Sequence, residues 1–397
     1  MRDTKRFFAT LAVASFFLYF GFNVWRALFN NFAVEVLDVG AAQIGLIQAL
    51  RELPGLLGFT VGFLVLWLSE MRVMWLSVLL LGLGLVLSGL ADTVSVLVLG
   101  TLVMSIGFHW FYPSNSSMVL IAVGEGEAPK MLGRLRSVAS FAAVIGTLVI
   151  WVFIDGVEFG PITIPGWGYR TLLLVVGGVV VVGGFVGLRG GFRGGAHQQK
   201  RKVVFRRDYW VYYALTFLMG SRRHIFTTFA IFMLVDIYGI DVRTTATLFL
   251  VNNLVNTYVS AQLGKSVARF GERKVLTANF LGLSGVFLGY AFVSYLPVLF
   301  LLFVLDNIFF GFNLAVDSYF QKIAYSPEEI TSNVSLGQTI NHVSALVVPI
   351  LGGLLWEQVA PWATFLAGVA IAVVSLVVVQ FIRTGPAVST VTVAPVD

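Results

Sequence analysis

Seven ionisable side chains stand inside stretches of the chain that are otherwise almost wholly apolar. They are Arg26, Arg51, Glu52, Arg222, Arg223, Asp306 and Asp317. An arginine carries a planar fork of N–H donors that fits a carboxylate or a phosphate, and an acid beside an arginine can bind and release a proton as its surroundings change from wet to dry. Because a charge exposed to lipid costs about 3 kcal/mol, these side chains must face one another, a water-filled cavity or an interface. The residue types therefore indicate anion binding and proton transfer within a membrane.

Polar residues also recur at helical spacing within these stretches. Asn23, Arg26 and Asn30 lie on one face of a helix. Asp306, Asn313 and Asp317 form a single stripe on the helix expected over 296–323. Other polar groups at helical spacing are His109 with Tyr112, Asn252 with Asn256, and Gln338 with Asn341 and His342.

The elements that must hold these residues are membrane-spanning helices. The chain has 397 residues, of which 58% are hydrophobic and 12% charged, and its mean hydropathy is +0.89. A soluble domain carries about 25% charged residues, and a stretch of about 20 apolar residues crosses a bilayer. The sequence therefore predicts an all-α membrane protein with 12 transmembrane helices, in two sets of six. The expected spans are 7–36, 42–68, 73–91, 94–123, 133–154, 170–188, 209–236, 242–268, 274–293, 296–323, 331–356 and 360–382.

The basic residues predict the orientation of the chain. Of 26 lysines and arginines, twenty fall at the N-terminus or in loops on one side of the expected membrane, and only Arg170 and Arg243 fall in the opposite loops. Loops rich in lysine and arginine stay in the cytoplasm, so both termini are expected to be cytoplasmic, and the net charge of +6 reflects topology rather than nucleic-acid binding. The N-terminus resembles a secretory signal but lacks a convincing cleavage site, so we expect an uncleaved first helix in a multi-pass protein of the cell inner (cytoplasmic) membrane.

The two sets of helices share sequence. RALFNNFA at 26–33 corresponds to RHIFTTFA at 223–230, and GFLVLWLSEMR at 62–72 corresponds to GKSVARFGERK at 264–274. We therefore expect two homologous bundles, joined by a basic cytoplasmic linker and followed by a flexible cytoplasmic tail. The expected domains are residues 1–188, 189–208, 209–383 and 384–397.

The segment at 264–274 resembles a motif of the major facilitator superfamily, in which a pattern of Gly, Asp-Arg, Gly and Arg/Lys follows the second and eighth helices. The matching residues are Gly264, Arg269, Gly271, Arg273 and Lys274, with Ala268 at the Asp position. In the first half only Gly62 and Arg72 match, and Leu66 stands at the Asp position. The resemblance implies two six-helix bundles about a pseudo-two-fold axis, with a central cavity lined by helices 1, 4, 7 and 10. It also implies that the five matching residues form a cytoplasmic gate, and we add Asp317 to this expected gate. The alternative is that the basic residues among them only anchor the loop on the cytoplasmic side of the membrane.

The repeat relates two arginines to each other. Arg26 and Arg223 occupy equivalent positions, and we expect both to contact an anionic substrate. A salt bridge between Arg26 and Glu52 is the alternative, because charges within a membrane normally have partners, and we expect Arg222 to pair with an acid or a carbonyl. The candidates for proton coupling are Glu52, Asp306 and His342, although a lone histidine is more often a hydrogen-bonding residue between helices. The other candidates for substrate binding are Asn30, His109, Tyr112, His224, Asn252, Asn256, Asn313 and Asn341.

These features predict secondary active transport of a small organic or phosphorylated anion by alternating access, coupled to protons. Efflux of amphipathic or cationic compounds is the alternative, favoured by the 35 Phe and 9 Trp; a membrane enzyme or receptor is a third class, which no catalytic motif or long loop supports. Without cysteine and with only four His, the chain has little to bind a metal, and we expect no enzyme activity, cofactor or metal. The expected partners are the substrate, protons and the lipid bilayer, with no nucleic acid, and we expect a monomer.

Overall fold

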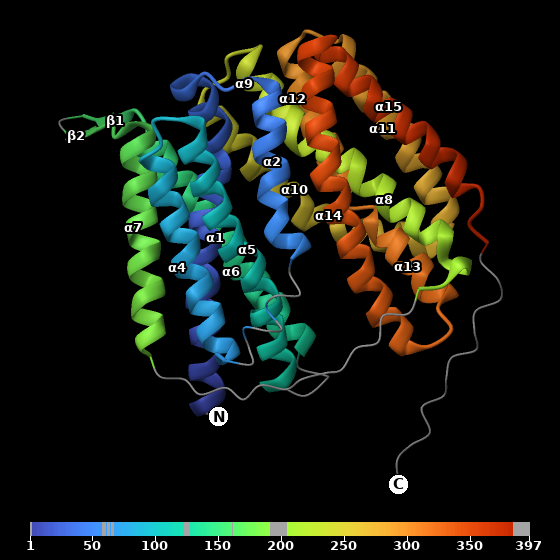
Figure 1. The fold of residues 1–397 in the computed structure, drawn as a ribbon, viewed down its shortest axis with the longest axis horizontal. Helices are drawn as coiled ribbons and strands as arrows, with labels where there is room; N and C mark the ends of the chain where they lie inside the picture. The colour runs from blue at the N-terminus through green and yellow to red at the C-terminus, as the bar shows by residue number, and fades with distance from the viewer. Residues whose placement is uncertain are drawn as a thin grey trace. The chain divides into compact units, whose positions relative to one another are not determined.

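The first half of the chain consists of helices and one short hairpin. The structure is a computed structural model that describes residues 2–57, 61, 64, 67–122, 128–160, 162–190 and 205–383. In Figure 1 the first-half helices run from blue to green. They are α1 (Arg2–Leu37), α2 (Ala41–Leu56), α4 (Glu70–Gly89), α5 (Val94–Ala122), α6 (Ala128–Phe153) and α7 (Gly168–Arg189), with strands β1 (Gly156–Phe159) and β2 (Ile162–Pro165) between α6 and α7.

The described residues of the second half form helices joined by short turns, and several of the helices are interrupted. Two interruptions fall inside spans that the sequence predicted as single helices, 209–236 and 296–323. The elements are η1 (Arg207–Tyr209), α8 (Trp210–Ile225), η2 (Phe226–Ala230), α9 (Ile231–Asp236), α10 (Val242–Phe270), α11 (Glu272–Phe292), α12 (Leu296–Phe310), α13 (Asn313–Ile323), α14 (Pro327–Gln358) and α15 (Pro361–Val379).

Nine of the described helical segments are long and apolar enough to cross a membrane. Three expected spans fall outside this set. The span at 42–68 contains residues that the structure does not describe, the span at 209–236 is interrupted, and α10 is richer in polar residues. The fold class, a helical membrane protein, is confirmed, whereas the expected number of 12 spans stays a prediction.

The chain divides into two compact units. The first unit comprises residues 1–198 and 231–250, and the second comprises residues 199–230 and 251–397. Of the predicted linker at 189–208, the stretch from 191 to 204 lies outside the described residues, as does the predicted tail at 384–397. The first unit therefore includes α9 and the beginning of α10 as well as the first-half helices.

In the first unit, glycines let α4 and α5 pack with their backbones almost in contact. A Cβ added at Gly84 would lie 2.3 Å from the Met104 backbone nitrogen, and one at Gly107 would lie 2.3 Å from the Ser77 carbonyl oxygen. Small residues serve this purpose in membrane proteins because lipid and leucine are equally apolar, so association depends on close packing. Larger residues at Gly84 or Gly107 would separate the two helices.

The core of the second unit is aromatic. Tyr209, Phe280 and Phe320 are almost fully buried, and the rings of Tyr212 and Phe320 stack with their centroids 4.1 Å apart. These residues come from α8, α11, α13 and the turn before α8, so the core joins segments that are far apart in the sequence.

The predicted stripe of Asp306, Asn313 and Asp317 does not lie on one continuous helix, and this corrects the sequence interpretation. α12 ends at Phe310 and α13 begins at Asn313. The amides of Gly311 and Phe312 donate to carbonyls only three residues earlier, which tightens the turn and shifts the register of the helix that follows. Asp306 is fully buried before this break, whereas Asp317 is exposed after it.

A second interruption follows the arginines of α8. Phe226–Ala230 forms one turn of π-helix, which separates α8 from α9. Wide turns of this kind inside helices often mark functional sites, because they redirect side chains and disturb the regular hydrogen bonds. Both interruptions therefore lie within a few residues of charged side chains inside the membrane.

The hairpin β1–β2 lies at the end of the first unit where α6 ends and α7 begins, and Figure 1 shows it projecting beyond α7. Arg243 at the start of α10 binds next to it, with Nε 3.5 Å from Asp155 and Nη2 donating to the Gly156 carbonyl at 2.7 Å. The other basic residue of the expected outer loops, Arg170, lies 2.9 Å from Asp92. Each of these two arginines thus has an aspartate partner in the first unit.

Candidate functional site

A fully buried ion pair joins α8 to α12 in the second unit. Arg222 Nη1 donates to Asp306 Oδ1 at 2.7 Å, and both side chains are 0% exposed. The pair confirms the expectation that Arg222 has an acid partner. Both helices are interrupted within six residues of the pair, since α8 ends at Ile225 and α12 at Phe310.

This ion pair is incompletely hydrogen-bonded. Among the described residues no partner reaches Arg222 Nε, Arg222 Nη2 or Asp306 Oδ2, and the hydroxyl of the buried Tyr290 also has none. Buried charges normally satisfy all their hydrogen-bonding atoms, because each unmade bond carries a desolvation penalty. The contact between Arg222 and Asp306 must therefore carry most of the stabilisation of both charges.

Arg223, the next residue, has a different environment. It is half-buried, and its guanidinium carbon lies 4.6 Å from the centre of the Phe310 ring. His224 beside it is 4% exposed. Arg222 thus lies in a sealed ion pair, whereas Arg223 is half-buried against an aromatic ring.

Arg26, which the repeat relates to Arg223, also stacks on a phenylalanine. Its guanidinium carbon lies 4.0 Å from the centre of the Phe249 ring, and the residue is half-buried. One turn further along α1, Asn30 is 4% exposed, and no described residue donates a hydrogen bond to its Oδ1. Cation–π stacking uses the face of a guanidinium, whereas its N–H groups donate to oxygen acceptors in the plane of the group.

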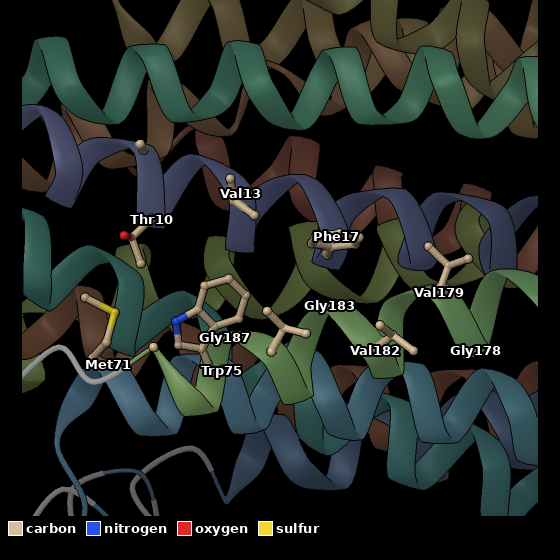
Figure 2. Close-up of a pocket in the computed structure, with 13 residues that line it drawn as sticks. Thr10, Val13, Phe17, Met71, Trp75, Gly178, Val179, Val182, Gly183 and Gly187 are labelled. Carbon is tan, nitrogen blue, oxygen red and sulfur yellow. The ribbon is translucent and has the colours of Figure 1, made fainter.

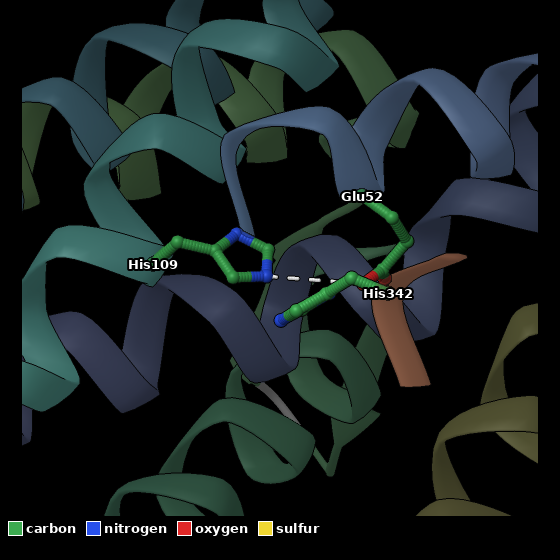
Figure 3. A group of neighbouring side chains, drawn as sticks. All are labelled: Glu52, His109 and His342. Carbon is green, nitrogen blue, oxygen red and sulfur yellow. Dashed lines mark ion pairs between the residues drawn. The ribbon is translucent and has the colours of Figure 1, made fainter. Parts of the chain in front are cut away.

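A second acid–base cluster lies between α2 and α5 in the first unit. Arg51 Nη2 lies 2.7 Å from Glu52 Oε1, and His109 Nε2 lies 3.8 Å from Glu52 Oε2, as Figure 3 shows. His109 Nδ1 lies 2.9 Å from the Ser105 carbonyl oxygen, and the Ser105 hydroxyl in turn donates to the Arg51 carbonyl. The side chains of Arg51 and Glu52 are 20% and 10% exposed, so this pair is less sealed than Arg222 with Asp306.

The remaining predicted binding residues are dispersed within each unit. On α5 Tyr112 is 58% exposed, and on α10 Asn252 is 4% exposed with no hydrogen-bond partner for its Oδ1 among the described residues. The Asn252 carbonyl accepts from Asn307 of α12 at 3.3 Å. The others are half-buried: Asn256 on α10, Asn313 at the start of α13, and Asn341 and His342 on α14.

The predicted gate residues lie around the start of α11. Gly271 precedes the helix with φ of 78°, a backbone conformation that favours glycine. Arg273 donates to Gln380 at 2.9 Å, while Arg269 and Lys274 are exposed and Gly264 is half-buried on α10. Gly62 and Leu66, the first-half counterparts of this pattern, lie outside the described residues.

The sequence interpretation missed the acid of this segment. Glu272 is 1% exposed, lies 2.6 Å from Lys322 Nζ and accepts from the Ser318 hydroxyl at 2.7 Å. These contacts join α11 to α13. In the aligned repeat Glu272 corresponds to Glu70, which is also buried, at 5% exposed. The repeat has a glutamate at the same position in both halves, directly after the aligned Ser69 and Gly271. This shared glutamate was the sequence signal that could have identified Glu272.

Another charged cluster joins the segment before α8 to the start of α14. Arg206 Nη2 donates to Glu329 Oε1 at 2.6 Å, and Tyr209 also donates to Glu329. The hydrogen bonds from Arg206 hold the pKa of Glu329 below its usual range. Sequence reasoning treated Arg206 only as a topology signal, because its partner lies more than a hundred residues away.

Comparisons with known proteins agree with this architecture. A family model described as the Major Facilitator Superfamily matches residues 11–324. The crystal structure of a bacterial homologue of the human lysosomal transporter Spinster, in an inward-facing and occupied conformation, is 14% identical with a TM-score of 0.76, over 96% of this chain and 97% of that one. The crystal structure of the nucleoside transporter NupG is 14% identical with a TM-score of 0.74, over 94% of this chain and 98% of that one.

No curated protein matches the chain by sequence. At 14% identity the two crystal structures show that the fold is shared. The match to the family model covers most of the chain. The chain therefore belongs to the Major Facilitator Superfamily, a family of transporters.

Proposed function

We propose that the protein moves a small organic or phosphorylated anion across the membrane by alternating access, and that this movement is coupled to protons. The supporting observation is the matched environment of two repeat-related arginines. Arg26 stacks on Phe249 at 4.0 Å and Arg223 stacks on Phe310 at 4.6 Å, and both are half-buried. Two guanidinium groups at equivalent points of the two halves suit a substrate with carboxylate or phosphate oxygens.

Several amides and histidines complete the proposed binding residues. The side-chain oxygens of Asn30 and Asn252 are buried without a hydrogen-bond donor among the described residues, so a substrate hydroxyl or amine could donate to them. We propose that the other predicted polar residues also form hydrogen bonds with the substrate. These are His109, Tyr112, His224, Asn256, Asn313 and Asn341.

For the proton, we propose Glu52 as the principal carrier. Glu52 lies 2.7 Å from Arg51 and 3.8 Å from His109, so a change in the position of either base would alter its affinity for a proton. Asp306 and His342 are further candidates. Asp306 would have to separate from Arg222 before it could bind a proton, because the two are sealed together.

The distribution of basic residues supports placing both termini in the cytoplasm and the protein in the inner membrane. On that orientation the segment from Gly264 to Lys274, with Asp317, lies at the cytoplasmic end of the second half, where we propose that it forms a gate. The contacts of Glu272 with Lys322 and Ser318 support this proposal, because they tie this segment to α13. We also propose that the protein works as a monomer.

The experiment that tests anion binding is a thermal-shift screen of the purified protein. The panel contains inorganic phosphate, glycerol 3-phosphate, lactate and citrate as anions and tetraphenylphosphonium as an amphipathic cation. We expect an anion to raise the melting temperature of the wild type and of Arg170→Ala, and to raise that of Arg26→Ala and Arg223→Ala much less at the same concentration. Arg170 is the matched control because it pairs with Asp92 near the start of α7 and has no proposed part in binding.

Two results would overturn the proposal. Stabilisation by tetraphenylphosphonium alone would favour the alternative function, efflux of amphipathic or cationic compounds. Undiminished stabilisation of Arg26→Ala and Arg223→Ala by the same anion would show that the two arginines do not bind it.

A further inference from the structure

An apolar cavity of about 750 Å³ lies in the first unit between α1, α4 and α7. Figure 2 shows Val13 and Phe17 of α1 across from Val182 of α7. Val182 is 62% exposed and Val186, which also lines the cavity, is 63% exposed, so the cavity opens to the outside of the helices. In a membrane protein such an opening faces lipid.

The lining offers almost nothing to a polar ligand. Its residues are apolar side chains or glycine except for Thr10, whose hydroxyl already donates to the Arg6 carbonyl at 3.0 Å, and the only other N–H or O–H group of a lining side chain is the indole N–H of Trp75. Along α7 the lining runs from Gly178 to Gly190, which corresponds to about 18 Å of helix. That length is close to the depth of one leaflet, half of a hydrocarbon core about 30 Å thick. The cavity therefore matches an acyl chain in chemistry and in length.

Three arginines lie near lining residues in the sequence, at the ends of α1, α4 and α7. Arg6 precedes Thr10 by one helical turn, Arg72 follows the lining residue Met71, and Arg189 precedes the lining residue Gly190. All three are exposed, and no salt bridge joins any of them to a carboxylate among the residues that the structure describes, although the Arg189 guanidinium carbon lies 4.1 Å from the centre of the Phe185 ring. In Figure 2 Thr10, Met71 and Gly187 lie together at the opposite end from Gly178. The ends of α1, α4 and α7 thus place positive charge at one end of an apolar groove.

We propose that this groove binds one anionic phospholipid, with an acyl chain along α1 and α7 and the phosphate at Arg6, Arg72 and Arg189. Each basic residue near a membrane surface attracts anionic lipid by about 1 kcal/mol, and the groove adds apolar contact for the chain. A second copy of the protein is a poorer occupant. Two copies related by a two-fold axis along the membrane normal would bring the same three arginines face to face.

Gly178 offers a way to fill the groove without disturbing the helices. A Cβ added there meets nothing within 4 Å, whereas one at Gly187 would lie 2.1 Å from the Trp75 ring. Gly178→Trp therefore places a large side chain in the groove and leaves the packing intact. Gly285→Trp on α11 of the second unit is the matched control, because a Cβ there also meets nothing within 4 Å.

The test is native mass spectrometry of the purified full chain with equal amounts of phosphatidylglycerol and phosphatidylcholine. We expect the wild type and Gly285→Trp to retain one phosphatidylglycerol after other lipid is removed, and Gly178→Trp to lose it. Arg6→Gln, Arg72→Gln and Arg189→Gln should each weaken phosphatidylglycerol binding by about fivefold, the factor that corresponds to about 1 kcal/mol, and leave phosphatidylcholine unaffected.

Equal retention of the two lipids by the wild type would overturn the proposal, as would retention of phosphatidylglycerol by Gly178→Trp. A dimer mass that Gly178→Trp converts to a monomer would show that a second copy fills the groove instead. Should an arginine variant fail to fold, the pair Gly178→Trp and Gly285→Trp still decides the question. A melting temperature for each variant identifies that case.

Discussion

Two arginine–carboxylate pairs within the expected spans differ in how far each is sealed from water. Arg222 and Asp306 meet between α8 and α12 at 2.7 Å, and both side chains are 0% exposed. Arg51 and Glu52 are adjacent on α2, also at 2.7 Å, but their side chains are 20% and 10% exposed, and His109 of α5 lies 3.8 Å from the same carboxylate. The two ion pairs are equally short, but they differ in how far their side chains are exposed.

This difference separates two roles that the sequence could not tell apart. A sealed pair resists any change in charge, because removing one partner leaves the other buried and uncompensated. A buried acid that is less completely sealed and has two bases nearby can gain or lose a proton with a small movement of its partners. We therefore expect Arg222 and Asp306 to hold the structure together beside the two interrupted helices, and Glu52 to respond to protons.

The largest expected effect comes from breaking the sealed pair. Asp306→Ala should lower the free energy of unfolding by about 3–5 kcal/mol, because Arg222 would remain charged in an apolar surrounding. Arg222→Ala should do the same. Denaturant unfolding in detergent, followed by tryptophan fluorescence, measures the change.

Replacing both partners together is the control. The variant with Arg222→Met and Asp306→Leu has no buried charge, so its stability should return to within a few kcal/mol of the wild type or exceed it. If the double variant is as unstable as the single ones, the cause is lost packing, and the comparison between the two pairs fails.

The next largest effect is expected at Arg223, which is compared with its neighbour Arg222. A charge-assisted hydrogen bond contributes about 1.5–3 kcal/mol, so Arg223→Ala should weaken anion binding roughly 10-fold to 150-fold. Its stability should change far less than that of Arg222→Ala, because Arg223 is half-buried against Phe310. Titration calorimetry and unfolding of the two variants measure both quantities. Equal losses of stability would contradict the assignment of separate roles to Arg222 and Arg223.

A smaller change of stability is expected at Arg51 and Glu52, the less completely sealed pair. Glu52→Gln keeps the shape of the side chain and should lower the free energy of unfolding less than Asp306→Asn does, because the Arg51 side chain left without its partner is 20% exposed, whereas that of Arg222 is 0% exposed. The same unfolding measurement applies, with Asp306→Asn as the matched variant of the sealed pair. A loss at Glu52→Gln as large as that at Asp306→Asn would remove the distinction between the two sites.

The smallest effect belongs to the pair outside the membrane spans. Arg206 lowers the pKa of Glu329, so the folded state favours the carboxylate more than the unfolded state does. Its contribution to stability is present above the ordinary glutamate pKa of about 4.3 and disappears as the pH falls through the lowered pKa. Arg206→Gln should therefore lower the melting temperature slightly at neutral pH, and the difference should shrink in acid. A difference that grows as the pH falls would have the wrong sign.

Much of the fold could be predicted from the sequence, because apolar length and basic loops depend on composition alone. The expected span at 94–123 corresponds to α5 at Val94–Ala122, and the one at 274–293 to α11 at Glu272–Phe292. The interruptions at Phe226–Ala230 and Gly311 could not be predicted in this way. Hydropathy over a window is insensitive to a change in the register of one or two hydrogen bonds.

Less of the candidate site could be predicted. Their position inside apolar stretches identified Arg222 and Asp306 as residues that need partners, but their pairing joins positions 84 residues apart, which the pattern within one helix cannot show. Glu272 was missed because an acid in the first turn of a helix is usually explained by the helix dipole. Its burial against Lys322 becomes visible only when α11 and α13 pack together.

The most direct test of the account is a measurement of proton movement with the anion that gives the largest thermal shift. Proteoliposomes that contain the protein and a pH-sensitive dye receive the anion outside, and the internal pH is followed. We predict a pH change that requires the anion in the wild type, and its loss in Glu52→Gln, which should still exchange radiolabelled anion across the membrane. Anion uptake by the wild type with no pH change, or an unaltered pH change in Glu52→Gln, would contradict the account.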